Sequence, residues 1–346
     1  MMWQVVDEVH EQPEVLSRLL TAGRPLVEQA AVRIRAAAPR FVVIAARGSS
    51  DNAARYAQYL LGAHNQLTVA LATPSLFTFY HRPPALAGSL VVGISQSGHS
   101  PDIVAVVTEG RRQGALTLAI TNDPTSPLAR AAELVLPLLA GEERAVAATK
   151  TYTAQLFVLA MLSAALSDDP TSWDDLALLP DRVAQTLVLN RDLPEQMTPL
   201  VSVRHLAVIG RGFNYATAFE VALKLKETCL LVAEPYSSAD FRHGPIALVE
   251  PGFPVVVVAP SGAVFPDVAA LVEELQARRA MLAVITDDPG LSGVADIALP
   301  LPAGVPEWLS PIVAVVPGQL LAVSLAQARG LDPDAPRGLR KVTRTL

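Results

Sequence analysis

The stretch that decides the fold of this 346-residue chain is Leu90-Val91-Val92-Gly93-Ile94-Ser95-Gln96-Ser97-Gly98-His99-Ser100-Pro101-Asp102. Its first five residues are aliphatic and rich in β-branched side chains, a pattern that predicts a short buried strand. Ser100 is a favourable N-cap, and Pro101 suits the first position of a helix that we expect to run toward Gly114. The stretch therefore predicts a strand, a loop and a helix N-terminus in succession.

The loop inside this stretch is rich in hydrogen-bond donors. Three serines surround Gly98, and the backbone N–H groups of the helix start lie beside them. Such groups, at the C-terminal end of a strand and against a helix N-terminus, bind anions and most often a phosphate. The alternative is an ordinary turn in which serine and glycine only cap the helix and shape the backbone. The three serines favour a phosphate, without indicating which molecule carries it.

The chain also repeats itself, with strand-end motifs recurring at offsets of 164 and 165 residues. Each half has the pattern of strand, helix, strand, helix and strand, followed by a further apolar strand. Strands that alternate with helices predict an α/β fold with a parallel sheet covered on both faces. The matching pairs are Arg47-Gly48 with Arg211-Gly212, Ser97-Gly98 with Ser261-Gly262, Pro101-Asp102 with Pro266-Asp267, and 120–124 with 285–289.

The duplication predicts two tandem domains with flanking segments. We expect a helical arm at 1–38, a phosphate-binding domain at 39–168, a helical linker at 169–198, a second domain at 199–330 and a tail at 331–346. The second half has Ala259-Pro260-Ser261-Gly262 where the first has Ser95-Gln96-Ser97-Gly98. Because that loop offers fewer donors, we expect one phosphate site per chain, in the first half.

Composition excludes several classes of function. The net charge of −6 argues against nucleic acid as a partner. The single cysteine, Cys229, allows neither an intrachain disulfide nor a cysteine metal cluster, and we expect no metal and no cofactor. The apolar run at 156–166 is too short to span a bilayer, and the run at 312–328 is interrupted by Pro317, Gly318, Gln319 and Ser324. With no signal peptide pattern at its start, the chain is expected to be cytoplasmic.

The four lysines stand out among 27 cationic residues that are otherwise arginine. Two of them lie on an expected helix at 214–228, where Glu220, Lys224 and Glu227 share one face. Such spacing commonly forms a solvated row of salt bridges. This helix, however, follows the first strand of its repeat and thus begins at an edge where ligands bind. His243, in a serine-rich loop before Gly-Pro, is a candidate for acid–base chemistry, although a lone histidine is more often structural.

Taken together, these residues resemble the two-domain form of the sugar isomerase (SIS) family over nearly the whole chain. Within it the chain is similar to the isomerase half of glucosamine-6-phosphate synthase and, most of all, to stand-alone glucosamine-6-phosphate deaminases. The resemblance implies flavodoxin-like three-layer αβα domains. It rests on Gly48-Ser49-Ser50, Ser95-Gln96-Ser97-Gly98, Val146-Ala147-Ala148-Thr149-Lys150, Ala222-Leu223-Lys224-Leu225-Lys226-Glu227, His243-Gly244-Pro245 and Lys341.

The resemblance also implies a role for each matching residue. Glu227 corresponds to the base that moves a proton between C1 and C2 of the sugar, and Lys224 to its partner. His243 corresponds to the ring-opening acid–base, donated by the other subunit of a homodimer. Lys341 corresponds to the lysine that forms a Schiff base with the open ketose. Substrate and phosphate contacts are implied for Gly48, Ser49, Ser50, Ser95, Gln96, Ser97, Ser100, Val146, Ala148 and Thr149.

The direction of the reaction follows from a further comparison within the family. The synthase has an N-terminal glutaminase domain, for which we expect no counterpart here, so ammonia release from glucosamine-6-phosphate is the expected reaction. One alternative is a deglycase acting on a fructose-amine 6-phosphate with the same proton transfer. A second alternative is a non-catalytic sugar-phosphate sensor, which would not need Glu227, His243 and Lys341 together.

Overall fold

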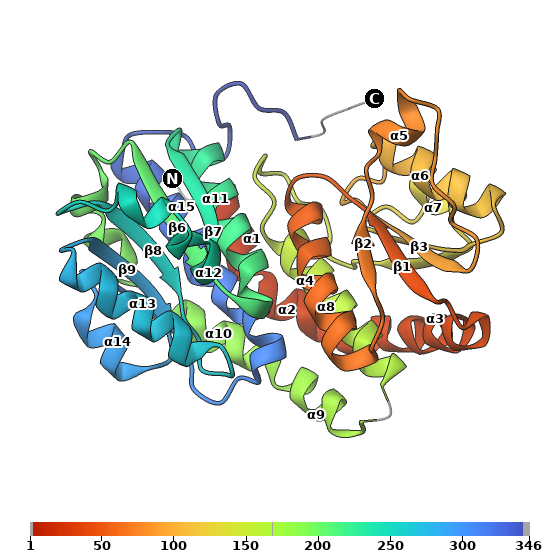
Figure 1. The fold of residues 1–346 in the computed structure, drawn as a ribbon, viewed down its shortest axis with the longest axis horizontal. Helices are drawn as coiled ribbons and strands as arrows, with labels where there is room; N and C mark the ends of the chain where they lie inside the picture. Colours follow the sequence, from red (N-terminus) through yellow and green to blue (C-terminus); the bar gives the residue numbers. More distant parts are fainter. Residues whose placement is uncertain (1–2, 168, 342–346) are drawn as a thin grey trace. The chain divides into compact units, whose positions relative to one another are not determined.

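The computed structural model describes residues 3–167 and 169–341 (Figure 1). These residues form two compact units, each built around one five-stranded parallel sheet. Among the described residues, unit 1 comprises 3–13, 144–149 and 178–339, and unit 2 comprises 14–143, 150–177 without 168, and 340–341. The predicted domain boundaries at 39–168 and 199–330 stay predictions.

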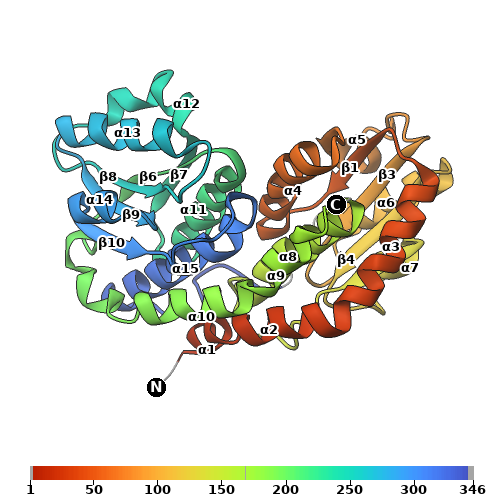
Figure 2. The same ribbon diagram turned by 90° about the horizontal axis from the view of Figure 1, so that it is seen from below.

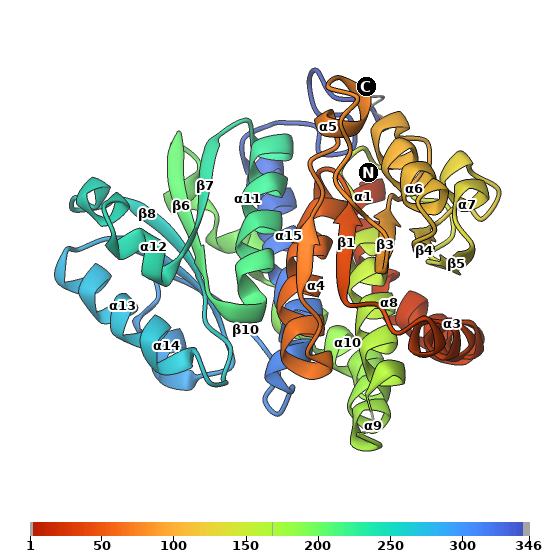
Figure 3. The ribbon, with the colours of Figure 1, turned by 45° about the vertical axis from the view of Figure 1, so that its right-hand side comes forward.

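The sheet of unit 2 has the strand order β2-β1-β3-β4-β5. Helices α6 (Pro101–Arg112) and α7 (Pro127–Ala131) cover one face, where Val43 and Val91 of the sheet meet Ile103 and Leu128. Helices α4 (Ser49–Asn65), α8 (Lys150–Leu166) and α3 (Arg24–Ala37) lie on the other side (Figure 3). The strands are β1 (Phe41–Ala45), β2 (Val69–Leu71), β3 (Ser89–Ile94), β4 (Leu116–Thr121) and β5 (Leu134–Pro137).

The sheet of unit 1 has the order β7-β6-β8-β9-β10, the same order as in unit 2. Helix α13 (Phe265–Ala277) covers one face, and α10 (Leu179–Leu189), α11 (Tyr215–Cys229) and α15 (Ser310–Ala328) cover the other (Figure 2). The shared strand order confirms the α/β duplication predicted from the repeat. The strands are β6 (His205–Gly210), β7 (Val232–Ser237), β8 (Pro254–Val258), β9 (Met281–Thr286) and β10 (Ile297–Pro300).

The edge strands β2 and β7 were not expected, because the sequence pattern indicated only four strands in each half. β2 has three residues, too few to show a period. β7 carries an exposed Glu234 and also Pro235, and a proline in the middle of a strand is tolerated on an edge strand but not on an inner one. Edge strands are held by pairing with a neighbour more than by their own apolar pattern, so their sequences give a weak signal.

The remaining helices are mostly short. The N-terminal segment is helical as expected, whereas the helical pattern at 173–189 forms two helices that meet at Leu178. The elements not yet named are α1 (Gln4–His10), α2 (Gln12–Arg18), a π-helix (Leu19–Gly23), α5 (Ser75–Thr78), α9 (Thr171–Ala177), α12 (Ser238–Arg242), α14 (Pro289–Val294) and 3₁₀ turns at Leu193–Gln196, Thr198–Leu200, Gly212–Asn214, Pro245–Leu248 and Glu307–Leu309.

Helix α15 corrects one expectation, because the run at 312–328 forms one continuous helix despite Pro317, Gly318, Gln319 and Ser324. It continues as helix through Pro317, a residue that removes one backbone hydrogen bond. At Gly318 a Cβ would lie 2.3 Å from Cγ2 of Val221, so this glycine allows α11 to pack closely against α15. In the described part of the chain, Glu307–Ala328 could cross a membrane by length and composition, but 94% of that window is buried in the fold, and core helices pass the same test.

Candidate functional site

The serine-rich loop after β3 in unit 2 is held by its own side chains. The Gly98 N–H donates to Oγ of Ser95 at 3.1 Å, and the His99 N–H donates to Oγ of Ser97 at 3.3 Å. Gly98 has a φ of 66°, and a Cβ there would lie 2.1 Å from Oγ of Ser126. Both the left-handed backbone and the close approach of Ser126 therefore require glycine at this position.

The start of α6 leaves backbone donors available beside this loop. Ser100 is the N-cap residue, as expected, but its side chain makes no capping hydrogen bond. Within the described residues, no protein acceptor is found for the N–H groups of Gln96, Ser97 and Ser100. Backbone N–H groups next to a helix N-terminus, together with serine hydroxyls, form a cradle for an anion.

Two further side-chain contacts hold the segments around the start of α4. The Arg47 guanidinium pairs with the fully buried carboxylate of Asp102, Nε to Oδ2 at 2.8 Å, and so ties the segment before α4 to the first turn of α6. Gly48, with a φ of 56°, turns the chain into α4, which begins at Ser49. Ser50 is buried, and its Oγ accepts a hydrogen bond at 3.0 Å from Nε2 of Gln155 on α8. Ser49 and Ser50 thus belong to the same unit as the loop.

Three other expected substrate contacts, Val146, Ala148 and Thr149, belong to unit 1, whereas the serine-rich loop belongs to unit 2. The Val146 N–H donates to the backbone oxygen of Asp334 at 3.4 Å, and the Thr149 oxygen accepts from Nε2 of Gln319 on α15 at 3.3 Å. The expected binding residues are therefore divided between the two units.

The equivalent loop in unit 1 is occupied by the protein's own carboxylates. Glu307 accepts the N–H of Ala263 at 2.8 Å and that of Val264 at 3.3 Å, at the start of α13. The Ser261 N–H donates to Oδ1 of Asp287 at 2.7 Å. Carboxylates of the protein thus fill the positions in this loop where an anion would bind, and the placement of the phosphate site in the first repeat stays a prediction.

Replacing Glu307 with alanine is expected to destabilise unit 1 by about 1–2 kcal/mol, because two backbone donors lose a charged acceptor. Urea denaturation followed by circular dichroism measures the effect. Glu250, an exposed acid after the Pro245–Leu248 turn, provides the control, and its alanine variant should unfold at the wild-type midpoint. Equal midpoints for all three proteins would show that the Glu307 contacts do not stabilise the loop.

Helix α11 of unit 1 carries the expected acid–base row, and this row is buried and not solvated. The Lys224 Nζ lies 2.5 Å from Oε2 of Glu227 and 3.4 Å from Oε1 of Glu220. The side chains of Lys224 and Glu220 are 3% and 0% exposed, whereas that of Glu227 is 23% exposed. A lysine between two carboxylates in a buried setting is costly to maintain, and only Glu227 has partial access to solvent.

The C-terminal turn of α11 is fixed to α15. Oγ1 of Thr228 and Sγ of Cys229 both donate to the backbone oxygen of Ala322, at 3.3 and 3.1 Å. Burial raises the pKa of the Cys229 thiol to about 11, so this residue is a protonated core thiol and not a nucleophile. These contacts, with the close packing at Gly318, set the position of the Lys224–Glu227 pair.

His243 lies just beyond α12 in the same unit, and it is exposed. No hydrogen bond or ion pair joins it to the Lys224–Glu227 pair in the described part of the chain. The start of α12 is anchored by Ser238, whose Oγ donates to Oδ2 of Asp267 at 2.5 Å. Burial raises the pKa of Asp267, but the Ser238 hydrogen bond and the Arg211 and Arg242 guanidiniums outweigh it and hold that pKa below its ordinary value.

Lys341, the expected Schiff-base lysine, is the last described residue and belongs to unit 2. Its Nζ lies 2.6 Å from Oε2 of Glu143, whose side chain is fully buried. The sequence did not single out Glu143, although it lies three residues before the 146–150 motif. Glu307 was missed as well, and Asp102 and Asp267 were noted only as matching positions of the two repeats, without a structural role.

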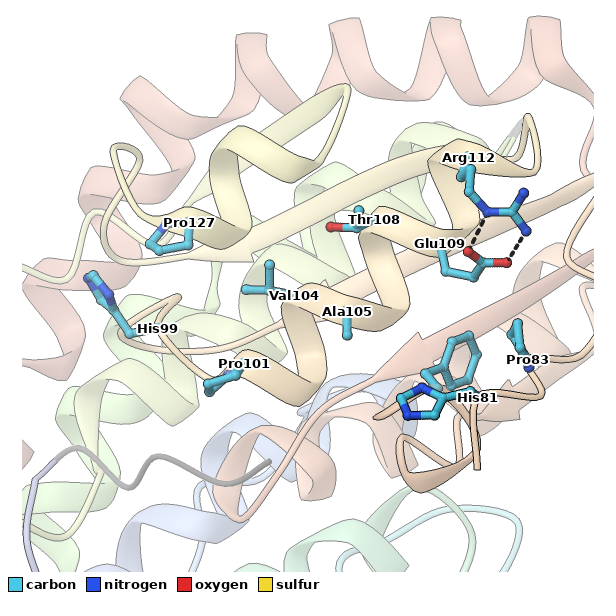
Figure 4. A pocket seen from close by; sticks show the side chains of 11 residues that line it. His81, Pro83, His99, Pro101, Val104, Ala105, Thr108, Glu109, Arg112 and Pro127 are labelled. Carbon is cyan, nitrogen blue, oxygen red and sulfur yellow. Dashed lines mark hydrogen bonds and ion pairs between the residues drawn. The ribbon is translucent and has the colours of Figure 1, made fainter. Parts of the chain in front are cut away.

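A separate cavity of about 770 Å³ lies along α6 of unit 2 (Figure 4). His99 and Pro101 line one end, and the Glu109–Arg112 ion pair lies at the other. No serine of the loop is among the described residues that line this cavity, but His99 and Pro101, on either side of Ser100, are. Among the described residues no cluster of three or more His, Cys, Asp or Glu could hold a metal ion.

Comparison with known families agrees with the two sheets. The SIS domain matches this chain twice, at residues 36–165 and 200–329. Each match spans one of the two sheets, and the first contains the serine-rich loop. The chain belongs to the SIS domain family.

Individual relatives agree with this assignment. The isomerizing glutamine–fructose-6-phosphate aminotransferase of Thermococcus kodakarensis is 38% identical over 97% of this chain, which spans 57% of that relative's length. A crystal structure of a proposed phosphosugar isomerase from Silicibacter pomeroyi DSS-3 is 36% identical, with a TM-score of 0.87, covering 96% of this chain and all of that one. The C-terminal domain of glucosamine-fructose-6-phosphate aminotransferase from Francisella tularensis is 28% identical, with a TM-score of 0.85 and coverages of 97% and 99%.

Proposed function

We propose that this protein is an amino-sugar phosphate isomerase that converts glucosamine-6-phosphate and water to fructose-6-phosphate and ammonia. The buried Lys224–Glu227 pair on α11 is the observation that carries the proposal. A solvated row of salt bridges would be exposed on all its members, whereas here only Glu227 is partly accessible. A sugar-phosphate sensor has no use for such a pair, because binding alone requires no proton transfer.

We assign the phosphate group to the serine-rich loop of unit 2. The N–H groups of Gln96, Ser97 and Ser100, with the hydroxyls of Ser95 and Ser97, supply donors without a compensating negative charge among them. This loop would bind the C6 phosphate and so fix the sugar for chemistry at C1 and C2. The loop would contribute to catalysis by orientation, because it would hold the sugar in one position relative to the reacting groups.

The chemistry is assigned to His243, Glu227 and Lys224. His243 opens the pyranose ring by moving a proton between the ring oxygen and the C1 hydroxyl. Glu227 then takes the proton from C2 and returns it to C1, while the Lys224 ammonium stabilises the charge on its carboxylate. The resulting ketimine at C2 is hydrolysed, which leaves fructose-6-phosphate and releases ammonia. In the reverse direction Lys341 would hold the open ketose as a Schiff base.

The proposal includes a homodimer, in which His243 serves the site of the other subunit, and a cytoplasmic location. The exposure of His243 is compatible with that role. Size-exclusion chromatography with light scattering tests the association state. A fully active monomer would contradict the shared site.

A substrate panel tests the proposed reaction on the full chain. Glucosamine-6-phosphate, galactosamine-6-phosphate and a fructose-amine 6-phosphate that carries an amino acid are each incubated with the protein. Ammonia, fructose-6-phosphate and free amino acid are then quantified. Ammonia and fructose-6-phosphate in equal amounts from the first substrate would support the deaminase. Release of amino acid from the third substrate alone would identify a deglycase, and binding without turnover would identify a sensor.

A further inference from the structure

Glu143 is a fully buried carboxylate whose place in the fold is not explained by packing alone. It lies in unit 2 between β5 and α8, and its side chain is 0% exposed. Burial of a carboxylate is costly unless charged or hydrogen-bonding partners surround it. The hydrogen-bond and ion-pair partners of Glu143 therefore indicate the structural role of its carboxylate.

Three donors converge on the two oxygens of Glu143. Oε1 accepts the backbone N–H of Thr151 at 3.1 Å, and Oε2 accepts Oγ1 of the same residue at 2.7 Å. Thr151 is buried and is the second residue of α8, so the carboxylate also lies at the positive end of a helix dipole. The third donor is Nζ of Lys341, at 2.6 Å from Oε2. The carboxylate is thus rigidly oriented by α8 before it meets the lysine.

Lys341, in contrast, lies in a segment with little regular structure. The residues before it, 331–340, form turns and bends, and Arg337 and Arg340 are exposed. An upstream anchor exists in unit 1, where the Asp334 carboxylate accepts the N–H groups of Gln4 and Val5 at 2.9 and 2.8 Å. Between Asp334 and Lys341 the described residues make two local contacts, from the Ala335 N–H to Oδ1 of Asp332 and from the Leu339 N–H to the Pro336 oxygen.

We propose that Glu143 is the positioning residue for Lys341: held by Thr151 at the start of α8, it fixes the Lys341 nitrogen and with it the course of the chain at Lys341. This inference deepens the proposed function, because it rests on the assignment of Lys341 as the Schiff-base lysine. A long, flexible lysine on an irregular tail would otherwise sample many rotamers, and a charged acceptor selects one of them. Glu143 acts through Lys341 and is not itself a catalytic residue.

Tail anchoring is tested with Lys341→Met and Lys341→Arg, which alter the contact from its partly exposed side and should leave the core intact. Limited trypsin digestion, followed by mass spectrometry, measures cleavage after Arg337 and Arg340, two sites present in every variant. We expect Lys341→Met to be cleaved at least tenfold faster than wild type, and Lys341→Arg, which keeps a cation for Glu143, at nearly the wild-type rate. Equal cleavage of Lys341→Met and wild type would overturn the proposal.

Orientation of the nitrogen is tested with Glu143→Gln and Thr151→Val. Fructose-6-phosphate is added, the imine is reduced with borohydride, and the Lys341 peptide is quantified by mass spectrometry. We expect at least a tenfold loss of trapped adduct in Glu143→Gln and a smaller loss in Thr151→Val, in samples whose circular dichroism matches wild type. Wild-type trapping in both variants would overturn the positioning role.

The two assays separate this proposal from the proposed function. If wild type forms no adduct, Lys341 is not a Schiff-base lysine and the deaminase assignment loses that step, while the tail-cleavage result still decides whether Glu143 holds Lys341. If wild type forms the adduct but releases no ammonia from glucosamine-6-phosphate, the proposed reaction fails and the positioning role stands. Should Glu143→Gln not fold, the two Lys341 variants decide the anchoring on their own.

Discussion

The Glu227→Gln variant is expected to release ammonia from glucosamine-6-phosphate some ~10²–10⁴-fold more slowly than wild type, as is typical when a positioned general base is lost. Glutamine keeps the size of the side chain and an oxygen that accepts from Lys224 Nζ, which lies 2.5 Å from Oε2 of Glu227. It cannot take up the proton from C2, so kcat should fall while KM changes little. Initial rates of ammonia release over a range of substrate concentrations measure both constants.

Glu234→Gln is the matched control for this experiment. Glu234 lies on β7 in the same unit, pairs with the partly exposed Lys226 at 3.6 Å, and its side chain is 53% exposed. The control should keep the wild-type kcat, because an exposed ion pair contributes little and no chemistry is assigned to it. If Glu227→Gln also retains the wild-type rate, the carboxylate does not move the proton and the proposed mechanism is wrong.

Lys224→Met is expected to lower the free energy of unfolding by about 3–5 kcal/mol, the usual cost of removing one member of a buried ion pair. The methionine fills much of the same volume but leaves the carboxylates of Glu220 and Glu227 without the ammonium that balances them. Glu220 is fully buried, so solvent cannot take over that role. Urea denaturation monitored by circular dichroism gives the change in midpoint and slope.

Lys226→Met, on the same helix, is the control for this substitution. The Lys226 side chain is 40% exposed and its partner Glu234 is 53% exposed, so the free energy of unfolding should change by less than about 0.5 kcal/mol. Equal destabilisation by the two variants would indicate that general helix propensity, and not the buried charge, explains the effect. A wild-type midpoint for Lys224→Met would show that other groups balance the charges of Glu220 and Glu227.

The repeat made most of the fold predictable. Four strand-end motifs at nearly one spacing indicated two α/β halves, and the two sheets with identical strand order confirm that prediction. The edge strands β2 and β7 were not predicted from the sequence. β2 is too short to show a period, and β7 contains Pro235 in its middle, where proline is tolerated only on an edge strand. The run at 312–328 was expected to be too interrupted to span a bilayer, yet it belongs to a helical stretch that is long and apolar enough to do so and is 94% buried in the fold.

The site was predictable only as a set of residue types. Periodicity placed Glu220, Lys224 and Glu227 on one face of a helix, yet a solvated row and a buried one have the same spacing. Burial of Lys224 between its carboxylates depends on how α11 packs against α15, which the sequence of either helix does not specify. The expected binding residues Val146, Ala148 and Thr149 likewise proved to lie in a different unit from the serine-rich loop.

By itself the sequence determined the class of fold, the duplication and the loop with donors for an anion, because these depend on local patterns that recur within a few residues. The tertiary structure alone decided which charges are buried and which side chains meet across long stretches of chain. Glu307 fills the loop at 261–264, and Glu143 meets Lys341 across 198 residues of sequence. Such contacts depend on the three-dimensional course of the chain, and no local pattern encodes it.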